Sequence, residues 1–151
     1  MERRRLLLGI VVLTATLGIA ACDEKLADLA GPTPNLVPTF SSIQREIFNA
    51  TDSSGRLACI NCHTDQGRTP AGGLLLVDGR SHASMVNIAS RFKAGATLVI
   101  PGDADNSYLI HKLEGRSDIT GSRMPRGTGP FLTQGQMEII RRWIALGAKN
   151  D

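Results

Sequence analysis

Five consecutive residues, Cys59-Ile60-Asn61-Cys62-His63, carry the most specific chemistry in this sequence. Two thiols three positions apart lie on one turn of chain, where both can add to the two vinyl groups of one porphyrin. The next residue, His63, then presents its imidazole to the iron as the proximal ligand. The C-x-x-C-H spacing therefore predicts one covalent haem c, attached through Cys59 and Cys62 and ligated by His63.

The C-x-x-C part of the motif also occurs in zinc sites and in thiol redox sites. A zinc site needs a second pair of ligands, and His82 and His111 are too widely spaced to form an H-x(3–5)-H pair. A thioredoxin-like site needs a βαβ pattern around the motif, and the sequence lacks one. The motif therefore favours haem.

The N-terminus predicts export. Arg3-Arg4-Arg5 precede an apolar run over residues 6–21, and the run ends in small residues, as in a secretory signal. Ile19-Ala20-Ala21-Cys22 resembles the end of a bacterial lipoprotein signal, which implies cleavage before Cys22 and acylation of Cys22. The alternative is an uncleaved membrane anchor, but 16 residues make about 24 Å of helix. That is short of a hydrocarbon core of ~30 Å.

These patterns divide the chain into three parts. Residues 1–21 are predicted to be the lipoprotein signal peptide, and residues 22–38 a lipid-anchored flexible tether that holds three prolines. Residues 39–151 are predicted to form one domain. The expected location is the bacterial cell envelope, with the domain facing the periplasm on a lipid anchor. The three cysteines are then all assigned, one to lipid and two to haem.

Charge excludes one class of partner. The whole chain has 17 Lys and Arg against 14 Asp and Glu, but without residues 1–21 the counts are 14 and 13. The sequence has no basic stripe and no nucleic-acid motif, so we expect no nucleic-acid partner.

The elements that must position the motif are predicted to be helices, in an all-α fold. Residues 41–48 are predicted to be helical with Ser42 as the N-cap, and residues 81–87 to form one or two helical turns. A third helix is expected to begin at Asp103 or Asp105 and to end at Gly115. The last helix is the clearest, because a Thr133–Gln136 capping box precedes apolar residues at helical spacing.

These features together resemble the cytochrome c family over residues 40–148. The quoted matches are the C-x-x-C-H motif, Pro101-Gly102-Asp103, Asn106-Ser107-Tyr108-Leu109, Lys112-Leu113 and Met124-Pro125. The resemblance implies cytochrome c-like helices wrapped around one covalent haem, with long loops and a C-terminal helix packed across the first. It also implies that Met124, on the loop before the last helix, is the distal iron ligand.

Two histidines compete with Met124 for the sixth position on the iron. His82 lies in a polar turn and is expected to be solvated, whereas His111 is expected at the rim or the surface. Met85 and Met137 are expected to be core residues. The favoured pair is therefore His63 and Met124, one of the recognised haem pairings.

The sequence thus predicts a membrane-tethered monohaem c-type cytochrome that carries single electrons between redox partner proteins and is not an enzyme. One alternative is a subunit that fixes a haem in a larger respiratory or photosynthetic complex. Another is a small haem peroxidase or gas sensor with an open sixth site, which needs a distal acid–base group. Several arginines are candidates for a haem propionate, although a solvated surface is the ordinary place for each of them: Arg116, Arg123, Arg126, Arg141 and Arg142.

Overall fold

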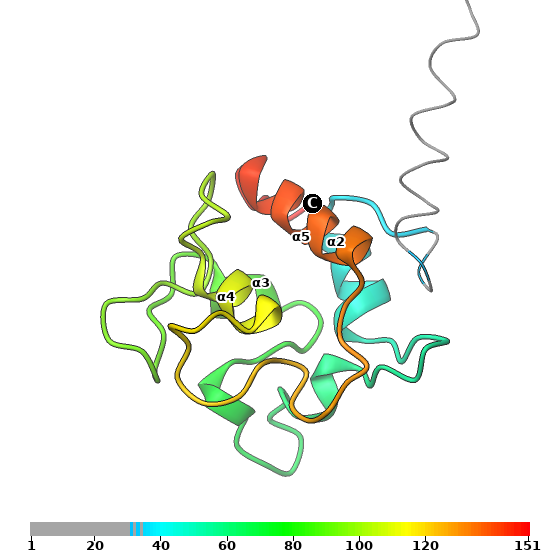
Figure 1. Cartoon of the computed structure of the whole chain (residues 1–151), viewed down its shortest axis with the longest axis horizontal. Helices are drawn as coiled ribbons and strands as arrows, with labels where there is room; N and C mark the ends of the chain where they lie inside the picture. The colour runs from blue at the N-terminus through cyan, green and yellow to red at the C-terminus, as the bar shows by residue number, and fades with distance from the viewer. Residues whose placement is uncertain (1–30, 32, 34) are drawn as a thin grey trace, which may run out of the picture.

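The computed structural model describes residues 31, 33 and 35–151 (Figure 1). The predicted signal peptide, the lipid attachment residue Cys22 and most of the predicted tether lie outside these residues. Ordered contacts begin ahead of residue 39: Leu36 is buried in the core, and the backbone N–H of Val37 donates to the Ser42 hydroxyl at 3.0 Å.

The helical segment that opens the described domain has two parts, an α-helical turn and a π-helical turn. Helix α2 spans Phe40–Ile43 and continues into the π-helical turn η1, Gln44–Phe48. Thr39 caps it, because its hydroxyl accepts from the Ser42 backbone N–H at 3.3 Å. The prediction of Ser42 as the N-cap is therefore wrong, since that hydroxyl faces the incoming chain instead.

The middle of the chain holds only short elements. The 3₁₀ turns η2 (Cys59–Asn61) and η3 (Ala71–Gly73) are followed by α3 (Ser81–Met85) and α4 (Tyr108–Glu114). Gly115 ends α4 with a φ of 73°, as predicted. The predicted caps of that helix are wrong: Ser107 precedes it without a side-chain cap, and Asp103 accepts from Asn106.

The last helix, α5, spans Gln134–Ala145 and confirms the predicted start. The Thr133 hydroxyl accepts from the Gln136 backbone N–H at 3.2 Å, and the Gln136 side chain accepts from the Thr133 backbone N–H at 2.9 Å. This reciprocal pair satisfies two donors that a helix start otherwise leaves unpaired.

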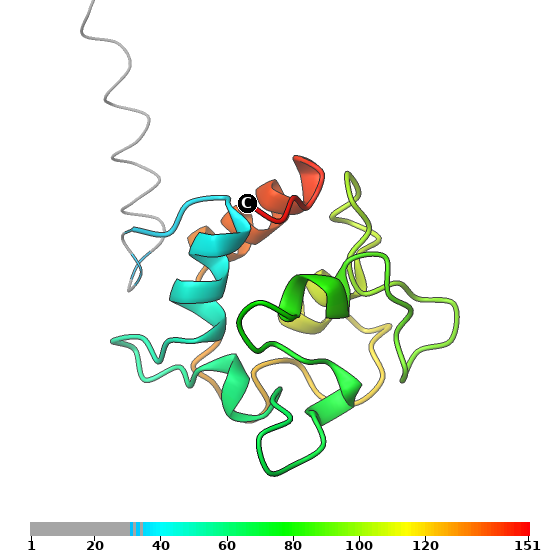
Figure 2. The same ribbon diagram turned by 180° about the vertical axis from the view of Figure 1, so that it is seen from behind.

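The predicted fold class is wrong for the described part of the chain. Its four α-helices have 4, 5, 7 and 12 residues, and only about a third of the described residues are helical. Among the described residues, helices that wrap around a cofactor are not seen, and coil predominates (Figures 1 and 2). Thirteen glycines have positive φ and recur from Gly31 to Gly147, which limits the length of regular helix between them.

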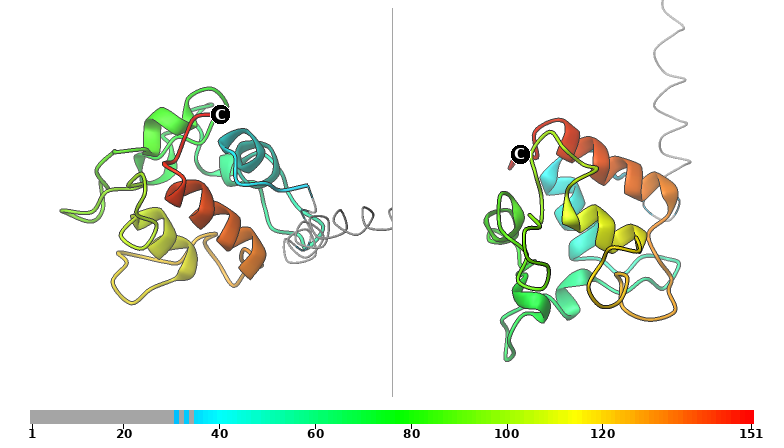
Figure 3. Two further views of the ribbon diagram at one scale, coloured as in Figure 1. Left: turned by 90° about the horizontal axis from the view of Figure 1, so that it is seen from above. Right: turned by 60° about the vertical axis from the view of Figure 1, so that its left-hand side comes forward.

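One hydrophobic core joins the segment around Phe40 to the C-terminal helix. The Phe40 ring on α2 lies 5.4 Å from the Trp143 ring on α5, and both side chains are buried. The last residue also closes on the first helix, because Asp151 accepts from the backbone N–H groups of Phe40 and Ser41. The views from above and from the side place α2 next to α5 (Figure 3). The two helices thus meet through this ring pair, but the C-terminal helix packed across the first that the resemblance implied is not among the main helix contacts of the described residues.

This core leaves the motif at one end of the molecule. The turn η2 and the segment between α4 and α5 both lie at the end drawn lowest in Figures 1 and 2, away from α5. Among the described residues, no helix is both long and apolar enough to cross a membrane.

Candidate haem site

The C-x-x-C-H motif forms a single tight turn. The backbone N–H groups of Cys62 and His63 both donate to the Cys59 carbonyl, at 3.2 and 3.0 Å. Cys59 is half-buried and Cys62 is exposed, and both are free thiols. The two sulfur-bearing residues therefore stand on one turn, as joint attachment to one porphyrin requires.

Cys59 is held on the core side of this turn. Its thiol donates to the Ile47 carbonyl at 3.4 Å. Burial raises the pKa of Cys59 to about 11, although the Arg56 guanidinium nearby acts in the opposite direction. The group is accordingly a neutral thiol at neutral pH, shielded from the side reactions of a thiolate.

His63 is oriented by the chain that follows the motif. Its Nδ1 lies 3.2 Å from the Leu74 carbonyl oxygen, and its own carbonyl accepts from the Leu76 N–H at 2.8 Å. Burial lowers the pKa of His63, while the carbonyls of Leu74 and Ala71 partly oppose that shift. A neutral imidazole whose Nδ1 faces a carbonyl is in the form in which histidine binds a metal through Nε2.

A buried ion pair fixes the loop that leads into the motif. The Arg56 Nε donates to Asp52 Oδ2 at 3.0 Å, and the two side chains are 0% and 2% exposed. Arg56 also donates to the Ile47 carbonyl at 3.1 Å, the same oxygen that the Cys59 thiol contacts. The position of Cys59 therefore depends on a loop locked at its core side.

Met124 lies on a segment tied to α4. Its backbone N–H donates to the Lys112 carbonyl at 2.8 Å, and Arg123 Nε donates to the Leu113 carbonyl at 2.7 Å. The Lys112 ammonium reaches back to the carbonyls of Thr120 and Ser122. The Met124 side chain is partly buried and packs against the hydrophobic core. This segment therefore holds the thioether in place without a helix of its own.

The two competing histidines are engaged elsewhere. His82 is half-buried rather than solvated, which corrects the prediction: its Nε2 lies 2.7 Å from the Ala148 carbonyl, and its ring packs edge-on against Phe40. His111 places Nδ1 2.8 Å from Asp118 and Nε2 2.7 Å from the Asp105 carbonyl. Both ring nitrogens of His111 are thus engaged, whereas His82 has one nitrogen engaged, by a carbonyl of the C-terminal segment. Met85 and Met137 are buried core residues, as predicted.

Most of the arginines that were candidates for a propionate already have partners. Arg116 and Arg141 both bind Glu114 and Asp105, and Arg123 lies over the Phe131 ring at 3.9 Å in addition to its bond to Leu113. These contacts hold α4, α5 and the segment between them together.

The donor set separates haem from zinc. Within residues 31, 33 and 35–151, no group of three or more His, Cys, Asp or Glu side chains is placed to hold a metal ion. Zinc needs three or four such ligands. Haem iron takes its four equatorial ligands from the porphyrin, so one imidazole and one thioether complete it. The residues present thus fit the donor chemistry of a c-type haem better than that of a zinc site.

Partly buried residues of the motif and of other segments pack against the hydrophobic core: Cys59, Ile60, Leu74, Leu98 and Met124. One cavity of about 480 Å³ lies beside the motif and is lined in part by Ile60, Asn61 and Thr64, and another of about 190 Å³ lies beside Gly72 and Gly73. Neither of these two cavities is lined by the motif cysteines, His63 or Met124.

Sequence reasoning missed the groups that support this site. The sequence showed no sign of a role for Arg56, which is buried, and offered Lys112 only as part of the family resemblance, although its ammonium anchors the Met124 segment. Leu74 acts through a backbone carbonyl, for which a sequence contains no signal.

Comparison with known proteins gives no relative. No family model, no curated protein and no solved structure matches this chain. The function must therefore be argued from the site itself.

Proposed function

We propose that this protein is a membrane-tethered monohaem c-type cytochrome that carries single electrons between redox partner proteins. Cys59 and Cys62 would hold the haem covalently, and His63 and Met124 would be the iron ligands. The haem supplies one iron that changes oxidation state by one electron. The residues of the chain would attach it, orient it and keep water from its iron.

The observation that carries this proposal is the relation between the motif turn and the Leu74 carbonyl. The turn presents both thiols of C-x-x-C-H, and Leu74 orients the following imidazole with a neutral ring. Two thiols, an imidazole and a carbonyl that orients that imidazole are what covalent haem attachment and proximal ligation need.

The engagement of His82 and His111 supports a carrier over a peroxidase. Peroxide cleavage needs a distal group that accepts and returns a proton. Both of these histidines contact carbonyl or carboxylate oxygens outside the motif. A six-coordinate iron with Met124 also leaves no open position for peroxide or a gas.

The test of this proposal is a redox titration of the purified holoprotein combined with exposure to carbon monoxide. The carrier predicts one reversible one-electron transition and no carbon monoxide complex in the reduced state. Ready binding of carbon monoxide by the wild-type protein would favour an open sixth site, and with it the sensor or peroxidase.

A further inference from the structure

Arg91 is set apart from most arginines of the domain. Seven of the ten between residues 35 and 151 donate to a carboxylate or to a backbone carbonyl: Arg45, Arg56, Arg68, Arg80, Arg116, Arg123 and Arg141. In the described structure the Arg91 guanidinium makes no ion pair and no hydrogen bond. Arg91 is an exposed residue, and its side chain lines one wall of the cavity of about 190 Å³.

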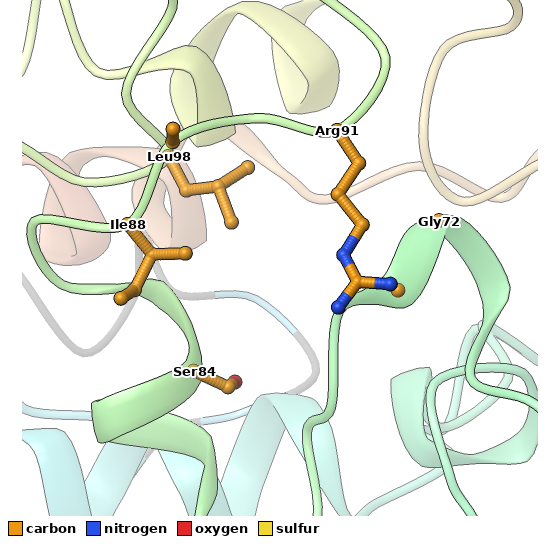
Figure 4. A pocket seen from close by; sticks show the side chains of 7 residues that line it. Gly72, Ser84, Ile88, Arg91 and Leu98 are labelled. Carbon is orange, nitrogen blue, oxygen red and sulfur yellow. The ribbon is translucent and has the colours of Figure 1, made fainter.

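The cavity has one charged residue among those that line it. Besides Arg91, the lining consists of glycines, apolar side chains and one hydroxyl: Gly72, Gly73, Ser84, Ile88, Ala89 and Leu98. Figure 4 shows the Arg91 side chain reaching from its loop toward the Gly72 segment, with Ile88 and Leu98 on the other side. An unpaired guanidinium in a largely apolar recess without an acidic residue suits a carboxylate, which it can bind through two parallel hydrogen bonds.

Gly73 makes the position of Arg91 possible. A Cβ atom at Gly73 would lie 2.5 Å from Arg91 Cδ and 2.7 Å from Nε. A Cβ at this position would require the Arg91 side chain to move, and the φ of +66° at Gly73 favours glycine independently. The arginine thus lies directly against the backbone of the 71–74 segment.

That segment is bonded to the haem motif on both sides of Gly73. The Ala71 N–H donates to the Cys62 carbonyl at 3.0 Å, and the Leu74 carbonyl faces His63 Nδ1. Arg91 is therefore one backbone segment away from the residues that would hold the haem. The cavity is much too small for a porphyrin ring, but it has room for one of its propionate arms.

We propose that Arg91 binds a carboxylate in this cavity and that this carboxylate is a propionate of the haem. This inference rests on the proposed function. The pairing would neutralise one negative charge of the cofactor and thereby stabilise the reduced iron. The other titratable side chains on the segments that form the cavity are His82, at the Ala148 carbonyl, and Lys93, paired with Asp118. His63 lies beyond Leu74.

The experiment compares the reduction potentials of the holoproteins Arg91→Gln and Arg142→Gln between pH 5 and 8. Arg142 is an exposed arginine of α5 and serves as the matched loss of one charge. We expect a lower potential and a new pH dependence in Arg91→Gln, because an unpaired propionate titrates closer to neutral pH. Gly73→Ala should shift the potential in the same direction by displacing the guanidinium. Arg91→Lys should give a smaller shift.

The outcomes separate this inference from the proposed function. A wild-type protein without covalent haem would overturn both. Covalent haem with the same potential and pH profile in Arg91→Gln and Arg142→Gln would overturn the inference alone. If Arg91→Gln does not load haem, an unchanged potential in Arg91→Lys and Gly73→Ala would overturn it equally. A wild-type potential that responds to acetate in place of chloride, at constant ionic strength, would overturn propionate as the source of the carboxylate.

Discussion

The Nδ1 atom of His63 lies 3.2 Å from the carbonyl oxygen of Leu74. This contact joins the C-x-x-C-H motif to a segment eleven residues farther along the chain and orients the imidazole. A histidine so held has Nε2 as its metal-binding atom. Because burial also lowers the pKa of His63, the ring is neutral and prepared for an iron at neutral pH.

Met124→Ala tests the distal ligand. If Met124 binds the iron, the oxidised wild-type protein should have a weak near-infrared sulfur-to-iron band, and the variant should lose it. Because a thioether stabilises ferrous iron, the variant should also have a lower potential and should bind carbon monoxide. Met137→Leu, a change in the core of α5, is the control and should keep the band. If the wild-type protein lacks the band and does not bind carbon monoxide, Met124 is not the distal ligand, and His82 and His111 are the ligands to test next.

Arg56→Met tests the ion pair beneath the motif. The change leaves Asp52 buried without its partner, which costs about 3–5 kcal/mol of unfolding free energy. Arg45→Ala removes an exposed arginine from a surface pair and should cost about 1 kcal/mol or less. Urea unfolding of the two variants measures the difference. Equal midpoints would show that the Asp52–Arg56 pair does not support the loop.

The pKa of Asp118 tests how the segment before Met124 is attached to the rest of the domain. Hydrogen bonds from Lys93 and His111 lower the pKa of Asp118 from its ordinary value of 3.8 to about 2. The ionised form is therefore favoured by folding. Its stabilising contribution is present above pH 3.8 and is lost as the pH falls toward 2. Carboxyl NMR should give this low pKa in the wild type and a higher one in Lys93→Met, and a wild-type value near 3.8 would contradict the pairing.

Cys22→Ser tests the predicted lipid anchor, which lies outside the described residues. Lipid chains on Cys22 would supply the membrane affinity, so the variant should move to the soluble fraction. Intact mass of the membrane-derived wild-type protein should show an acylated Cys22 and no residues 1–21. A mature protein that begins at Met1 would replace the lipoprotein with an uncleaved anchor.

The sequence was informative where local chemistry decides structure. The Thr133–Gln136 capping box and the end of α4 at Gly115 both follow from residues at the helix ends themselves. It failed where distant backbone takes part. The Ser42 hydroxyl accepts from the Val37 N–H instead of capping a helix. His82 is half-buried because it contacts the Ala148 carbonyl and the Phe40 ring.

The prediction of an all-α fold was wrong for a related reason. Helical spacing of apolar residues is visible over α5, but no local signal shows that residues 49–107 hold together mainly through loop contacts. Those contacts run between backbone groups, as from Leu76 to His63 and from Leu98 to Ile88. A sequence reading that counts side-chain periodicity cannot detect them.

The most direct test of the account is whether the haem stays on the polypeptide after denaturation. Thioether bonds to Cys59 and Cys62 predict that peroxidase staining for haem survives denaturing electrophoresis of the wild-type protein. They also predict that intact mass shows one added haem and that Cys62→Ala sharply reduces it. Complete extraction of haem into acidified organic solvent, or a wild-type mass without haem after expression with the haem-attachment machinery, would contradict the account.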